Sequence, residues 1–195
     1  MNKRGFQAMK SRTLEALHKV GRCYETGDGV GKDDTEAVKW YRVAAELGFA
    51  PAMFELGKCY ALGIGARRNR VSAAKWLRLA AEHGHARAMD TLGKWLLDGV
   101  LIKADPHEGV KWLRRAADRG DARGMFHLGE CFETGDGVKK DSDKAYVWFC
   151  RAVVAAPDDD WLYDRVQDHV FDPNLKEVRE SLLNPQTAPD KETAK

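Results

Sequence analysis

Three kinds of residue recur every 36 positions along this 195-residue chain, and this periodicity restricts its fold more than any other feature. The recurring positions hold Gly21, Gly57, Gly93 and Gly129, then Trp40, Trp76, Trp112 and Trp148, and finally Ala44, Ala80, Ala116 and Ala152. A fixed period of about 20 to 50 residues is typical of arrays in which each structural unit stacks on the next. We therefore predict four units without insertions, over 13–48, 49–84, 85–120 and 121–156.

Each unit carries two helical patterns separated by a glycine-rich turn. In the second unit, apolar residues recur at helical spacing in two segments: Ala52, Met53, Leu56 and Tyr60, then Val71, Ala74, Leu77, Ala80 and Ala81. The turn Thr26 to Val30, repeated at Thr134 to Val138, supplies glycines that accept a positive φ where the first helix ends. Each unit is therefore predicted to be a helix hairpin.

Helix start and stop signals recur with the same period. The second helix of each unit follows a residue whose side chain can accept hydrogen bonds from free N–H groups, namely Asp33, Asn69, Asp105 and Asp141. Gly48, Gly84 and Gly120 end these helices. A glycine inside a helix costs about 1 kcal/mol relative to alanine, so the Gly21 column predicts close packing. We expect the repeat tryptophan to fill the space that a Cβ would take.

Four segments of the second unit match a known family pattern. Ala52 to Tyr60, Gly63 to Gly65, Ala73 to Trp76 and Ala80 to Gly84 closely resemble the Sel-one-like repeat (SLR), a relative of the tetratricopeptide repeat. The resemblance extends over 13–156. It implies an all-α fold, a right-handed α/α superhelical solenoid in which the first helix of each hairpin lines a concave face. Members of this family are mostly adaptors, so the resemblance also implies protein binding.

Both ends of the array differ from the repeat. Residues 1–12 form an N-terminal extension in which Arg4 to Arg12 can add a turn of helix. After Ala156 the register ends, because Trp161 and Asp164 stand where Met and Leu are expected. We predict C-terminal capping helices within 157–183, at 160–171 and 173–183, because the last unit of a solenoid needs a cover for its apolar side. The polar tail 184–195 is expected to be disordered.

Charge and hydropathy exclude several classes of protein. The chain has 32 Lys and Arg against 30 Asp and Glu, and this net charge of +2 gives no field that would favour nucleic acid. No stretch approaches the roughly 20 apolar residues that a membrane span needs, and the N-terminus lacks the apolar run of a signal peptide. We expect a cytoplasmic monomer, or a secreted or periplasmic protein if a signal has been removed.

The residues that usually carry chemistry are arranged as structural residues here. Cys23, Cys59 and Cys131 share one repeat position and are expected to be buried thiols, while Cys150 could meet Cys131 across the last hairpin. His83 and His85 flank Gly84, which is a weak metal signal. Neither a nucleophile with its base nor a phosphate-binding loop is present in the sequence. We therefore expect no enzyme activity, no cofactor and no metal.

The face of the first helices turned away from Ala52, Leu56 and Tyr60 is the predicted partner-binding wall. Its candidate residues are Arg22, Phe54, Lys58, Leu62, Asp90, Lys94, Leu97, Leu101, Phe126 and Glu130. Apolar anchors within a charged rim favour a partner groove. The alternative is that the apolar members pack against the adjacent hairpin. Leu101 replaces the turn glycine of the other units, and it either exposes an apolar patch or tucks beneath a neighbour.

Two functions are compatible with such a wall. The first is a non-enzymatic adaptor or scaffold that binds a peptide or helix of another protein on the concave face. The alternative is an immunity protein or inhibitor that neutralises a cognate bacterial toxin, such as a secreted lipase effector.

Overall fold

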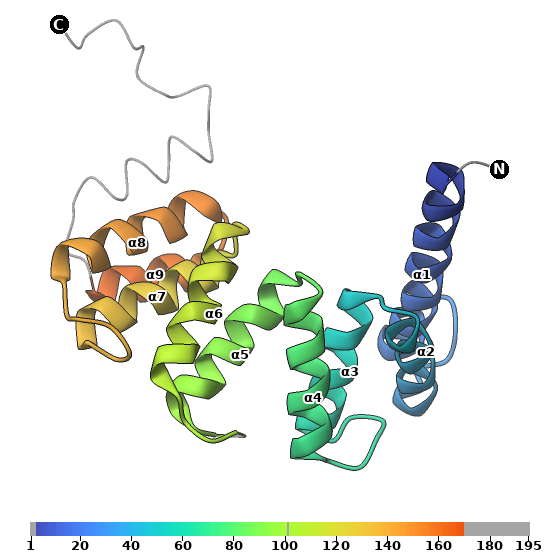
Figure 1. Cartoon of the computed structure of the whole chain (residues 1–195). Helices are drawn as coiled ribbons and strands as arrows, with labels where there is room; N and C mark the ends of the chain where they lie inside the picture. Colours follow the sequence, from blue (N-terminus) through green and yellow to red (C-terminus); the bar gives the residue numbers. More distant parts are fainter. Residues whose placement is uncertain (1–2, 101, 170–195) are drawn as a thin grey trace, which may run out of the picture.

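The structure of the protein is a computed structural model that describes residues 3–100 and 102–169. Helices account for all regular structure in this part of the chain (Figure 1). Their bounds are α1 Lys3–Thr26, α2 Asp34–Glu46, α3 Ala50–Leu62, α4 Arg70–Glu82, α5 Ala86–Asp98, α6 Pro106–Asp118, α7 Ala122–Thr134, α8 Ser142–Ala155 and α9 Asp160–His169.

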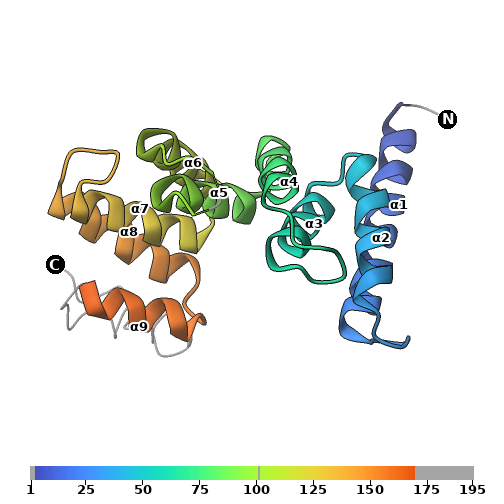
Figure 2. The same cartoon turned by 90° about the horizontal axis from the view of Figure 1, so that it is seen from below.

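Each pair of consecutive helices forms one hairpin, and the hairpins follow one another along the chain. The closest packing is within the hairpins, α1 with α2, α3 with α4, α5 with α6 and α7 with α8, and each hairpin then contacts the next. Figures 1 and 2 show this curved row, with α1 at one end and α9 at the other. The predicted all-α solenoid is confirmed.

The predicted caps of the second helices form their hydrogen bonds. Oδ1 of Asp33 accepts from the N–H groups of Thr35 and Glu36, at 2.9 and 3.0 Å. Three equivalent bonds begin the later second helices, from Ser72 to Asn69, from Glu108 to Asp105 and from Lys144 to Asp141. The periodic caps thus set where each second helix begins.

The turn glycines let the loop of one hairpin approach the hairpin before it. Gly65 has φ +63°, and a Cβ at this residue would lie 1.9 Å from the carbonyl oxygen of Asp34. The same relation joins Gly137, with φ +68°, to Pro106 at 2.3 Å. Only glycine fits such a close contact between backbones. Leu101, at the equivalent position of the third unit, lies outside the described residues.

The helical glycine column is filled by a different residue from the one we expected. A Cβ on Gly57 would lie 2.8 Å from Cγ of Leu77, and the other glycines face Tyr41, Leu113 and Phe149 in the same way. The prediction that the repeat tryptophan fills this space is wrong. Each of these side chains follows the tryptophan by one residue, and one residue turns a helix by about 100°.

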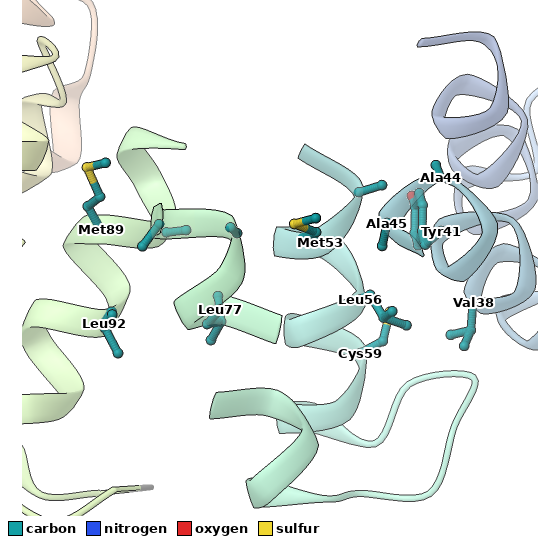
Figure 3. Close-up of a cluster of buried hydrophobic side chains, with 14 of the residues drawn as sticks. Val38, Tyr41, Ala44, Ala45, Met53, Leu56, Cys59, Leu77, Met89 and Leu92 are labelled. Carbon is teal, nitrogen blue, oxygen red and sulfur yellow. The ribbon is translucent and has the colours of Figure 1, made fainter. Parts of the chain in front are cut away.

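A continuous apolar core runs through the first three hairpins. Figure 3 shows side chains from α2, α3, α4 and α5 that pack in one buried layer, including Tyr41, Leu56 and Leu77. Cys59 and Cys131 are buried, as predicted, and burial raises their thiol pKa values to about 11 and about 12. Cys23, at the same repeat position, is only partly buried, so the prediction is wrong for this residue. Cys150 forms no disulfide with Cys131.

The two ends of the array differ from the sequence expectation. Helix α1 is one continuous 24-residue helix, so residues 3–12 extend the first repeat helix rather than adding a turn before it. The repeat register continues in α9 with a shift of two residues, since Asp159 caps this helix as Asp121 caps α7. Leu162 and Val166 are fully buried there. The predicted segments 173–183 and 184–195, and residues 170 and 171, lie outside the described residues.

Candidate protein-interaction surface

The later first helices of the hairpins lie next to one another. Helix α5 contacts α7 directly and α7 contacts α9, whereas the second helices α2, α4, α6 and α8 show no comparable contact with one another in the described chain. The larger contacts between non-consecutive helices of the described chain therefore lie on the side of the first helices. We call the solvent-facing side of α1, α3, α5, α7 and α9 the inner surface.

Aromatic stacking joins α3 to the start of α5. The rings of Phe54 and His85 are stacked with their centroids 4.7 Å apart. Nδ1 of His85 also accepts a hydrogen bond from the N–H of Ala88 at 3.1 Å, which caps α5. Burial lowers the pKa of His85 below its ordinary value and so favours the neutral ring that this bond requires. Phe54 is half-buried by this contact.

Polar side chains join α5 to α7. Nδ1 of His127 donates to Oδ1 of Asp90 at 2.6 Å, and Arg87 lies 3.5 Å from Oδ2 of Asp121. Only 5% of Asp90 is exposed. Burial raises the pKa of the Asp121 carboxyl, and the nearby Asp90 charge raises it further. These pairs fix the relative position of the two helices, because buried polar groups are costly without a partner.

The last junction covers α7 with α9. The ring of Phe126 lies against Trp161 and His169, at centroid distances of 6.1 and 5.7 Å. Along the same two helices, Arg165 lies 3.9 Å from Glu130 and His169 lies 2.7 Å from Glu133. Helix α9 therefore lies where the first helix of a further hairpin would lie. It covers Phe126, which we had predicted to be part of the partner-binding wall.

Some predicted partner-binding residues do lie on the open inner surface. Arg22 is exposed on α1, and 64% of Leu62 is exposed at the end of α3. Lys58 and Lys94 are partly exposed and form ion pairs within their own helices, with Glu55 at 2.6 Å and with Asp98 at 3.4 Å. Glu130 remains at the edge of α9.

Other predicted residues are buried or packed between hairpins. Only 1% of Phe126 is exposed, because α9 covers it, and Asp90 is buried by its bond to His127. Neither side chain is thus exposed on the inner surface, and for Phe126 the alternative of packing against the neighbouring part of the array holds. Leu97 also packs against the core. Leu101 lies outside the described residues.

Sequence reasoning missed an exposed aromatic residue at the last junction. Trp161 is 46% exposed, and the guanidinium of Arg123 lies over its ring, 4.8 Å from the centroid. With the two-residue shift, Trp161 occupies the repeat position of Arg87 and Arg123. A repeat alignment that allowed this shift would have placed Trp161 on the inner surface.

No group of three or more His, Cys, Asp or Glu in the described part of the chain is arranged to hold a metal ion. None of the described helices is both long enough and apolar enough to cross a membrane. What the inner surface offers is apolar and aromatic side chains beside basic ones.

The family model described as the Sel1 repeat matches this chain four times. The matches cover residues 14–49, 50–85, 86–121 and 122–153. Each begins one residue later than the unit that we predicted from the sequence. No curated protein matches the chain.

Solved structures with the same arrangement come from several bacteria. A Sel1 repeat protein from Oxalobacter formigenes is 27% identical with a TM-score of 0.77, over 89% of this chain and 73% of that one. A protective antigen with an SLR fold from uropathogenic Escherichia coli strains is 33% identical with a TM-score of 0.69, over 85% of this chain and only 37% of the antigen. The Helicobacter pylori cysteine rich protein B shares the fold at 23% identity and a TM-score of 0.52, over 69% and 95% of the two chains.

Proposed function

The chain belongs to the Sel1 repeat family, whose fold generally serves as a protein-interaction scaffold, and we propose that it binds a segment of another protein on its inner surface. The observation that carries this proposal is the pair of exposed apolar side chains on that surface. Leu62 and Trp161 remain exposed although the neighbouring junctions bury Phe126 and Asp90.

The surroundings of these two side chains fit the energetics of protein recognition. Trp161 lies beneath the guanidinium of Arg123, and Leu62 is one helical turn from Lys58. Tryptophan and arginine are enriched among the residues that contribute most to binding free energy, within a rim of charged groups. A protein segment with apolar anchors is therefore the class of ligand that this surface fits.

The inner surface is also rigid in the places that would position such a ligand. The stack of Phe54 on His85 and the bond of His127 to Asp90 tie neighbouring first helices together. A preorganised surface loses less conformational entropy on binding. Since Leu62 lies on α3 and Trp161 on α9, the bound segment would extend along several hairpins, as an extended peptide or a helix does.

A capture experiment with matched variants tests this proposal. The test variant is Leu62→Asp combined with Trp161→Ala, and the control is Val71→Asp, which changes an exposed apolar residue on α4. We expect the test variant to lose the partner while the control retains it. Thermal melting of both variants separates lost binding from lost folding. Equal recovery by the test variant and the wild-type chain would reject the inner surface as the binding site.

The alternative function, inhibition of a toxin, would use the same surface. The activity of the bound partner distinguishes it from the adaptor role. If the captured protein is an enzyme, its activity is measured with increasing amounts of the wild-type chain and of the test variant. If the wild-type chain lowers the activity and the test variant does not, inhibition is favoured. Unchanged activity of the bound partner would favour the adaptor role.

A further inference from the structure

One repeat position on the inner surface changes its charge from one end of the array to the other. Counted with the two-residue shift before α9, the five first helices carry at this position Arg22, Lys58, Lys94, Glu130 and Asp168. The position is positive in α1, α3 and α5 and negative in α7 and α9. Since α1 and α9 lie at opposite ends of the row in Figures 1 and 2, the two signs are separated along the inner surface.

The three middle members of this position have charged partners within the chain. These pairs are Lys58 with Glu55 at 2.6 Å, Lys94 with Asp98 at 3.4 Å and Glu130 with Arg165 at 3.9 Å. Each pair balances the charge that a ligand would otherwise meet. The unbalanced charges therefore lie at the two ends, on α1 and α9.

The α1 end presents two cations without an acidic partner. Arg22 and Lys19, which is one helical turn before it, are exposed and form no ion pair with the described residues. In α3 the position of Lys19 holds an acid, Glu55, so this pair of cations is particular to α1. The acids of α1 within about a turn of the two cations accept hydrogen bonds from other side chains, Glu25 from the hydroxyl of Tyr41 and Glu15 from Oγ of Ser11.

The α9 end presents two acids beside an exposed aromatic ring. Asp164 and Asp168 are exposed and lack an ion pair within the part of the chain that the structure describes. Arg165, three residues before Asp168, faces Glu130 on α7 instead. Asp164 lies one helical turn after Trp161, which is 46% exposed. This end of the surface therefore favours a cationic group of a ligand next to Trp161.

We propose that the protein segment bound by the inner surface carries acidic residues over α1 and basic residues over α9, with apolar residues for Leu62 and Trp161. This inference rests on the proposed function and adds the charge pattern of the partner. Complementary charges across an interface fix the register of a ligand and exclude partners of the wrong sign. The segment would therefore lie along the array in one direction only.

Other ligands match this arrangement less well. A nucleic acid presents a row of phosphates, and the acids on α9 would repel one end of that row. A second copy of the chain also has complementary ends, so the test includes self-association.

Labelled peptides of defined charge test the pattern, with fluorescence anisotropy as the readout. The parent peptide has glutamates at one end, lysines at the other and leucine and tryptophan between them, and the neutral peptide has glutamine in place of every charge. At low ionic strength we expect the full-length chain to bind the parent peptide about tenfold more tightly than the neutral one. High salt should remove most of this difference, because it screens exposed charges.

The outcomes separate this inference from the proposed function. Equal affinities for the two peptides would overturn the charge pattern and leave the proposed function in place. If neither peptide binds, or if the Leu62→Asp, Trp161→Ala variant binds both as the wild type does, the proposed function fails as well.

Charge reversal on the chain should change the preference for peptides rather than only weaken binding. Lys19→Glu with Arg22→Glu should bind a peptide with lysines at both ends about tenfold more tightly than the wild type does. Asp164→Lys with Asp168→Lys should gain as much for a peptide with glutamates at both ends. A gain of affinity cannot result from a loss of folding, so the absence of both gains would overturn the proposal.

Two control variants reverse exposed charges away from the inner surface. They are Lys139→Glu with Lys140→Glu, in the loop between α7 and α8, and Glu82→Lys with Asp118→Lys, at the ends of α4 and α6. Equal gains in these controls would show that net charge alone causes the effect, against the proposal. A wild-type dimer in light scattering that both inner-surface reversals dissociate would assign the two ends to a second copy instead.

Discussion

Gly93 lies directly against Leu113, and a Cβ on this glycine would come within 2.8 Å of Cγ of the leucine. The carbonyl oxygen of Gly109 would lie 3.0 Å from the same added atom. The close approach of α5 to α6 therefore depends on the missing side chain. The helical glycine is tolerated despite its entropic cost because it permits this packing.

The Gly93→Ala change should destabilise the protein even though alanine favours helices by about 1 kcal/mol. Overpacking of a core costs about 1 to 3 kcal/mol, so we expect a lower free energy of unfolding. The control is Gly31→Ala, because an added Cβ there meets no atom within 4 Å. Urea unfolding of both variants measures the effect, and a Gly93→Ala chain as stable as the control would contradict it.

Protonation of His85 should weaken the fold at mildly acidic pH. Burial lowers the pKa of this ring below 6.5 in the folded chain, so the unfolded chain binds the proton first as the pH falls. The stability contributed by the neutral ring is therefore present above pH 6.5 and is lost below it. We expect Tm to decrease from about pH 7.5 to about pH 5.5.

The His85→Asn variant isolates this effect from other titrating groups. Asparagine can cap α5 but does not titrate in this range. Burial also lowers the pKa of His18, and that contribution is common to both chains. We therefore expect a smaller loss of Tm with pH in the variant than in the wild type. Parallel curves of Tm against pH for the two chains would show that His85 does not cause the loss of stability.

The pair of Asp90 and His127 should show energetic coupling between two repeats. Loss of either partner leaves a buried polar group unsatisfied, at a cost of about 1 to 3 kcal/mol. A cycle of Asp90→Ala, His127→Ala and the double variant should give a coupling energy of about 0.5 to 3 kcal/mol. For comparison, Asp98→Ala removes an exposed ion pair to Lys94 and should cost less than about 1 kcal/mol. Additive effects at Asp90 and His127 would disprove the coupling.

Helix α9 should be required for a stable, dispersed protein. Leu162 and Val166 are fully buried against the fourth hairpin, and each such side chain contributes about 1.5 to 3 kcal/mol. We expect a chain that ends after Ala156 to aggregate or dimerise, and Leu162→Asp in the full chain to lower Tm strongly. Asp164→Ala, on the exposed side of α9, is the control. A monomeric truncated chain with an unchanged Tm would show that α9 is not a cap.

The sequence alone determined the elements and their order. A 36-residue period, caps such as Asp33 and turn glycines such as Gly65 act through hydrogen bonds and backbone angles within a few residues. Local interactions of this kind are visible in the order of residues. The hairpins and the solenoid could therefore be predicted, as could the exposure of Arg22 and Leu62.

Tertiary structure decided which side chains remain accessible. Phe126 and Asp90 occupy the same repeat position as Phe54, yet α9 buries the first and His127 binds the second. Leu77 rather than Trp76 fills the space beside Gly57. The burial of a residue depends on which side chains of the following helix lie over it. The two-residue shift before α9 changed which side chains of α9 lie over α7. Such contacts join residues 30 to 40 positions apart, where periodicity fixes the position of a side chain but not what covers it.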